Sequence, residues 1–147
     1  MEISNKIKTY KTSNTTVHSC QYHVIFCTKY RRKVLEGVIL DRVKELILSK
    51  QNEYHYEILE MEALEDHIHL LIDANPFYGI YETINHIKGF TSRQLRLDFP
   101  ELKKKLPTLW TRTKFISTCG SVSLEIVKRY IEDQKKYPKY YKTKKDL

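Results

Sequence analysis

The segment that most constrains the fold is 67–73, His-Ile-His-Leu-Leu-Ile-Asp, which ends just before the turn signal Asn75-Pro76. Successive side chains of a β-strand point to opposite faces of the sheet. Ile68, Leu70 and Ile72 therefore share one face, and the two histidines share the other. The segment predicts a strand whose apolar face points into a core covered by helices, while its two histidines point away from that core.

The rest of the chain supplies strands and helices around this segment. β-branched and aromatic runs predict strands, and apolar residues at helical spacing predict helices. We expect a basic connection over 101–110, and we expect Gly120 to separate the last strand from the last helix. The resulting order, β-α-β-β-α-β plus an extra C-terminal helix, predicts an α+β fold of the ferredoxin-like, split-βαβ type. The expected strands are 17–28, 55–62, 67–73 and 113–119, and the expected helices are 38–53, 79–97 and 123–136.

Length and composition indicate one domain spanning 1–147, with a loose N-terminal arm over 1–15 and a basic tail over 138–147. The sequence has no run of about 20 apolar residues and no secretory h-region, so we expect a cytoplasmic protein without a membrane partner. Its cysteines are odd in number and form no CxxC pair, which favours buried free thiols. They are Cys20, Cys27 and Cys119.

A formal net charge of +8 suits a polyanionic partner, most often nucleic acid, although simple solubility is the alternative. Basic side chains in several segments are candidates for phosphate or base contacts, and each alone could equally be a solvated surface charge. The candidates for DNA binding are Lys29, Arg31, Arg32, Lys33, Lys88, Arg93 and Arg96.

His67 and His69 point the same way from the predicted strand, so both imidazoles could bind one divalent metal. Alone, the pair could also be ordinary surface histidines. Asp66 precedes them and is either a turn residue or an acid that orients an imidazole from behind.

Tyr130 and Gln134 are four residues apart and so share one face of the last predicted helix. Alone, they could be a tyrosine at the core edge and a surface glutamine. Together with the histidines they suggest a tyrosine hydroxyl that attacks a phosphodiester polarised by a cation. Imidazole and amide oxygen ligands favour Mg²⁺ or Mn²⁺, and Zn²⁺ or Co²⁺ stay open.

With these motifs, the sequence resembles the single-tyrosine HUH transposases, including the related repeat-associated tyrosine transposases. The resemblance covers roughly residues 15–137 and rests on His67-Ile68-His69, the Tyr-x-x-x-Gln helix and the segments 22–33, 87–93 and 115–118. It implies a nucleophile, Tyr130, and three metal ligands, His67, His69 and Gln134. The implied reaction cuts and rejoins single-stranded DNA beside hairpin-forming insertion-sequence ends through a 5′-phosphotyrosine.

The resemblance also implies a ferredoxin-like homodimer whose active sites are shared between chains, with Gly120 as a possible hinge. One departure is Glu65, which stands where relatives often have proline before the Asp-His-x-His stretch.

Other functions stay open at this stage. A domesticated repeat-associated endonuclease would use the same residues. A nucleic-acid-binding module would bind without catalysis, and a metal-dependent hydrolase would use water as its nucleophile. A phosphate-binding loop of the GxxxxGK[ST] type is absent from the sequence. Rejoining through a phosphotyrosine would need no ATP.

Overall fold

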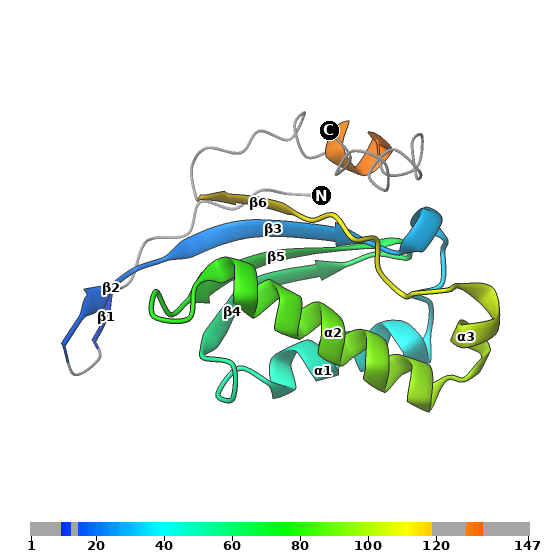
Figure 1. The fold of residues 1–147 in the computed structure, drawn as a ribbon, viewed down its shortest axis with the longest axis horizontal. Helices are drawn as coiled ribbons and strands as arrows, with labels where there is room; N and C mark the ends of the chain where they lie inside the picture. Colours follow the sequence, from blue (N-terminus) through cyan, green and yellow to red (C-terminus); the bar gives the residue numbers. More distant parts are fainter. Residues whose placement is uncertain (1–9, 13–14, 119–128, 134–147) are drawn as a thin grey trace.

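A four-stranded antiparallel sheet forms the centre of the computed structural model (Figure 1), which describes residues 10–12, 15–118 and 129–133. Its strands lie side by side in the order β4-β5-β3-β6. Their bounds are β3 Gln21–Cys27, β4 Tyr56–Ala63, β5 His67–Ala74 and β6 Phe115–Thr118. The predicted strands are thus confirmed, and the two central ones, β3 and β5, are almost wholly buried.

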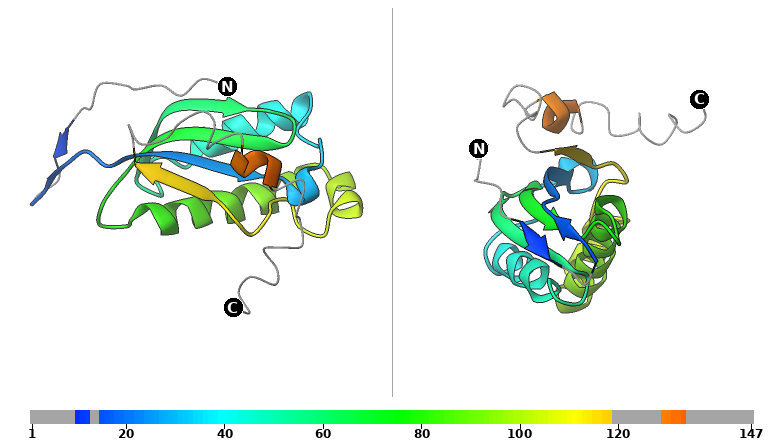
Figure 2. Two further views of the ribbon diagram at one scale, coloured as in Figure 1. Left: turned by 90° about the horizontal axis from the view of Figure 1, so that it is seen from above. Right: turned by 90° about the vertical axis from the view of Figure 1, so that its left-hand side faces the viewer.

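Two long helices, α1 (Val38–Ser49) and α2 (Ile80–Asp98), cover one face of the sheet. Both are amphipathic and turn buried aliphatic residues toward the strands. Element order and strand order together give the predicted ferredoxin-like fold. The helical residues 129–133 lie across the opposite face of the sheet, as the two views in Figure 2 show. In the described part of the chain, no helix is long and apolar enough to span a bilayer.

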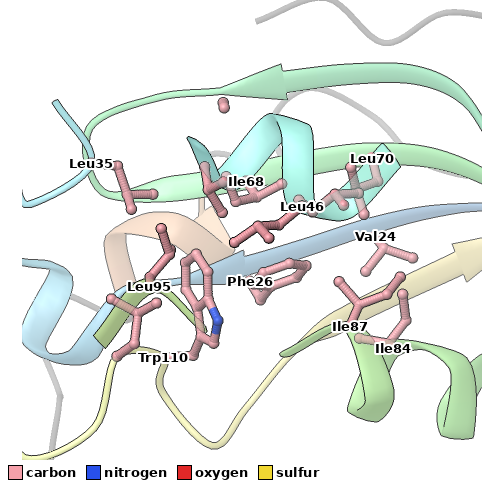
Figure 3. Close-up of a cluster of buried hydrophobic side chains, with 14 of the residues drawn as sticks. Val24, Phe26, Leu35, Leu46, Ile68, Leu70, Ile84, Ile87, Leu95 and Trp110 are labelled. Atoms are coloured by element: carbon pink, nitrogen blue, oxygen red, sulfur yellow. The ribbon is translucent and has the colours of Figure 1, made fainter. Parts of the chain in front are cut away.

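The main core fills the space between the sheet and the two helices (Figure 3). Phe26 on β3 is fully buried and meets Trp110 edge to face, with ring centroids 4.8 Å apart. The Trp110 indole donates a hydrogen bond to Thr91 Oγ1 at 3.0 Å, so its polar atom is satisfied inside the core. The apolar face predicted for residues 67–73 contributes Ile68, Leu70 and Ile72 to this core.

The segment 101–110 differs from the simple connection that we predicted. It contains a short helix, α3 (Glu101–Lys105), and its leucines at 102, 106 and 109 are buried together with Trp110. The three consecutive lysines of α3 made this segment look like a solvated connection in the sequence. In the structure they lie on the exposed side of the helix, while its leucine is buried.

The N-terminal region also differs from the prediction. The expected strand 17–28 is divided into β2 (Val17–His18) and β3, and β2 pairs with β1 (Lys11–Thr12) inside the region expected to be a loose arm. Helix α1 ends at Ser49, four residues before the predicted end, and turns lead to His55, whose φ of 57° is left-handed.

The cysteine prediction is tested at two positions. Cys27 is buried with a free thiol, and Cys20 is a half-buried free thiol. Burial raises the pKa of the Cys27 thiol to about 12, so it stays protonated and unreactive at neutral pH. Cys119, the Gly120 hinge and the tail 138–147 lie outside the described residues.

We expect Phe26→Ala to lower the free energy of unfolding by about 3–5 kcal/mol, since it removes a fully buried ring and leaves a cavity beside Trp110. Urea denaturation followed by tryptophan fluorescence would measure this. As a control, Leu97→Ala should change stability by less than about 0.5 kcal/mol, because Leu97 is 59% exposed on α2. Equal effects of the two substitutions would contradict this account of the core.

Candidate active site

The pairing of β3 with β5 determines what lies on the face opposite the two long helices. In the antiparallel register, Cys27 pairs with His67 and Ile25 pairs with His69. Directly paired residues share a face, so Ile25 and both histidines point away from α1 and α2. The common orientation inferred from the sequence for the two histidines therefore agrees with the structure.

Asp66 lies directly behind His67. Its Oδ1 is 2.8 Å from His67 Nδ1, so the carboxylate accepts a hydrogen bond from the imidazole. This bond places the imidazole proton on Nδ1 and leaves the Nε2 lone pair for another partner. His67 Nε2 is buried and has no hydrogen-bond partner among the residues described.

Asp66 is held as an anion by its neighbours. Burial alone would raise its pKa, but the hydrogen bonds from His67 and Arg31 and the charge of Arg31 outweigh burial and lower the pKa to about 2. Asp66 is therefore charged at every pH at which the chain would be assayed, and it can orient His67 throughout that range.

His69 lies beside a third histidine that the sequence analysis did not single out. His23 Nδ1 is 3.3 Å from His69 Nε2, and the two rings are stacked with centroids 5.5 Å apart. Burial, together with the charges of His23 and His67, lowers the pKa of His69 to about 4. Burial also lowers the pKa of His23, against an opposing effect of Glu60. His69 is thus neutral at pH 7, the form in which an imidazole binds metal.

These histidines fit a divalent cation as a partial ligand set. His67 presents a buried lone pair, and His69 is neutral close beside it. In the described part of the chain, no group of three or more His, Cys, Asp and Glu side chains could hold a metal alone. A further ligand would have to be of another type or lie elsewhere, and the predicted ligand Gln134 lies outside the described residues.

Tyr130 lies on the histidine face of the sheet. Its helical segment places Ile131 against Ile25, and Tyr130 packs on this small cluster with Phe115 of β6. Because Ile25 is the cross-strand partner of His69, this packing brings Tyr130 over the strands that carry the histidines. The hydroxyl of Tyr130 donates to Thr113 Oγ1 at 3.4 Å.

Four of the seven basic candidates for DNA binding are held by the protein itself. Lys29 is buried with its ammonium over the ring of Tyr30, and Arg31 is bound to Asp66. Lys88 donates to the carbonyls of Thr111 and Thr113, and Arg96 donates to the carbonyl of Pro107. The other three, Arg32, Lys33 and Arg93, are exposed, with Lys33 4.0 Å from Glu65.

Comparisons with known proteins identify the family. Residues 16–134 match the family described as IS200-like transposases. The chain is 33% identical over 120 residues to the ISDra2 transposase TnpA of Deinococcus radiodurans, covering 80% of this chain and 86% of the relative. It is 30% identical over 122 residues to the transposase for insertion sequence element IS200 of Salmonella typhimurium, covering 80% of each.

Solved structures are also similar to this chain. A transposase crystal structure from Deinococcus radiodurans has a TM-score of 0.77 and 29% identity, covering 84% of this chain and 97% of the other. A REP-associated tyrosine transposase bound to a REP hairpin has a TM-score of 0.52 over 90% of this chain and 69% of the other. At 11% identity, this structural similarity supports the fold alone.

Fold and relatives together define a transposase, an enzyme that cuts DNA and transfers strands. The chain belongs to the IS200-like transposase family. The family resemblance noted in the sequence is thereby confirmed.

The buried ammonium of Lys88 generates a prediction about pH. Burial, with a smaller effect of Lys114, lowers the pKa of Lys88 from 10.5 to about 7. Between these values the unfolded chain keeps a proton that the folded chain has lost, so the wild type gains stability as pH rises, by at most about 1.4 kcal/mol per pH unit. Lys88→Met should lack this gain.

Urea denaturation at pH 7.5 and 9.5 would measure the difference in free energy of unfolding between the wild type and Lys88→Met. This difference should shift in favour of the wild type at the higher pH. Lys104→Met, which removes an exposed lysine of α3, serves as the matched control and should show no such shift. A pH-independent difference for Lys88→Met would show that the amine titrates normally.

Proposed function

We propose that this transposase cuts single-stranded DNA at insertion-sequence ends with the hydroxyl of Tyr130. The main observation in support is that Tyr130 packs over Ile25, the cross-strand partner of His69, on the face that bears both histidines. A nucleophile and a candidate metal site thus share one surface. The confirmed family supports a DNA substrate for that surface.

The proposed chemistry conserves the energy of the broken bond. The tyrosine oxygen attacks the scissile phosphorus, the bond from phosphorus to the 3′ oxygen breaks, and a free 3′ hydroxyl leaves. The 5′ phosphate stays on Tyr130 as a phosphotyrosine. A second 3′ hydroxyl then attacks the same phosphorus and releases the tyrosine, so the strand is rejoined without ATP.

His67, His69 and Gln134 would hold the divalent cation, Mg²⁺ or Mn²⁺, which when bound polarises the phosphate and offsets developing charge. Asp66 would keep the His67 lone pair directed at the ion through its bond to Nδ1. Thr113 Oγ1 accepts a hydrogen bond from the Tyr130 hydroxyl and would restrict the position of that oxygen.

DNA recognition is proposed to involve hairpins near the cleavage site, as in the REP-associated relative, whose solved structure holds a REP hairpin. The exposed cations Arg32, Lys33 and Arg93 are the best placed of the predicted set to contact phosphates. The active form would be a homodimer that shares active sites between chains.

Covalent capture tests the function directly. Labelled single-stranded oligonucleotides tiled across both flanks of the gene would be incubated with the protein and Mg²⁺ or Mn²⁺, then run on a denaturing gel. We expect a metal-dependent band of slower mobility that is absent for Tyr130→Phe. Cleavage without this band would favour a water nucleophile, and DNA binding with neither cleavage nor band would favour a binding module.

The role of Asp66 can be tested through the metal requirement. Asp66→Asn should raise the Mn²⁺ concentration for half-maximal adduct formation by about 10- to 100-fold, because the amide cannot orient and polarise His67 as the carboxylate does. Glu65→Gln is the matched control, since it neutralises the adjacent, exposed carboxylate and should leave the requirement unchanged. An unchanged requirement in Asp66→Asn would remove Asp66 from the proposed site.

A further inference from the structure

The side chain of Arg31 connects two parts of the candidate active site. Its Nε donates to Asp66 Oδ2 at 2.7 Å, and its Nη1 donates to the carbonyl oxygen of Ile131 at 3.2 Å. The other oxygen of Asp66 accepts from His67. One guanidinium therefore joins the carboxylate behind His67 to the residue that follows Tyr130.

The backbone is held in an unusual conformation at this point. Tyr30 and Arg31 have φ values of 57° and 51°, in the left-handed region that costs side-chain-bearing residues about 1–3 kcal/mol each. Two hydrogen bonds of Thr28 stabilise the turn. The Thr28 carbonyl accepts from Arg31 N at 2.9 Å, and the Thr28 hydroxyl donates to the Arg32 carbonyl at 2.6 Å. A strained conformation that the surroundings enforce is a reason to look for a role of its side chain.

Arg31 is poorly placed to act as a simple phosphate contact. Its side chain is 21% exposed, and its charge is already paired with Asp66, whereas the adjacent Arg32 is exposed. The planar guanidinium fork also matters, because it donates in two directions at once. A lysine ammonium keeps the charge but lacks this rigid, two-directional geometry.

We propose that Arg31 is a positioning residue that fixes the helical segment of Tyr130 relative to His67, acting through Asp66 on one side and the Ile131 carbonyl on the other. This inference rests on the proposed function, in which Tyr130 is the nucleophile and His67 a metal ligand. It goes beyond that function by assigning to an arginine predicted for DNA binding a role in aligning nucleophile and metal site.

The test compares Arg31→Gln and Arg31→Lys in the covalent-capture assay. At saturating oligonucleotide and metal, both variants should form the Tyr130 adduct roughly 10- to 100-fold more slowly than the wild type, because small misplacements of reacting groups cost rates of this order. Their Kd for the same oligonucleotide should stay within about threefold of the wild type, since the charge that Arg31 carries is already neutralised by Asp66.

Arg42→Gln is the matched control. Arg42 Nε also binds a carboxylate, Asp98 Oδ2, at 2.9 Å, but it does so between α1 and α2, in the layer opposite the histidine face. This variant loses the same charge and a comparable ion pair, and it should retain the wild-type adduct rate. If Arg31→Gln fails to fold, Arg31→Lys retains a cation beside Asp66 and allows the same comparison.

Two results would overturn the inference while the proposed function stands. The first is wild-type adduct rates in both Arg31 variants. The second is a raised Kd in Arg31→Gln that Arg31→Lys restores, with a salt slope of log Kd reduced by about one, as expected for a phosphate contact. A wild-type chain that forms no Tyr130-dependent adduct would overturn the proposed function and this inference together.

Discussion

The antiparallel register of β3 against β5 is the constraint from which the rest of the molecule follows. Pairing Ile25 with His69 and Cys27 with His67 puts both histidines on one face. The alternate residues of the same strands, among them Phe26 and Ile68, face the helices and build the core. A slip of one residue would exchange these two sets, burying imidazoles against α1 and α2. The stability of the core and the composition of the site are therefore fixed by the same hydrogen-bond ladder.

The sequence was sufficient for the fold because the strands and helices have clear periodicities. The alternation of residues 67–70 assigns both faces of β5, although Leu71 joins the histidine face. The amphipathic helix expected over 79–97 is observed over 80–98. Prediction failed where local signals conflicted with tertiary packing. The lysines of α3 suggested a solvated connection, although Leu102 beside them is buried. The division between β2 and β3 was also missed, because Ser19 and Cys20 do not break a strand pattern.

For the site, the sequence identified residue types but not their partners. The proximity of His23 to His69 depends on strand register, which one sequence does not specify. His23 could have been noticed because it lies an even number of residues from Ile25 and Cys27 in a predicted strand, and so shares their face. The basic residues show the opposite problem. Lys88 and Arg31 look like surface charges in a basic chain, but both are bound to groups of the protein itself.

The net charge of +8 therefore has to be divided between basic residues that are bound to groups of the protein and those that are exposed. Lys88 fixes the carbonyls of Thr111 and Thr113, and the Thr113 hydroxyl contacts that of Tyr130. Arg31 fixes the carbonyl of Ile131. Two of the basic residues predicted to bind DNA thus hold backbone close to the tyrosine. A basic side chain that is ion-paired or buried inside the protein contributes little to counterion release, so the salt dependence of DNA binding should follow the exposed cations rather than the total.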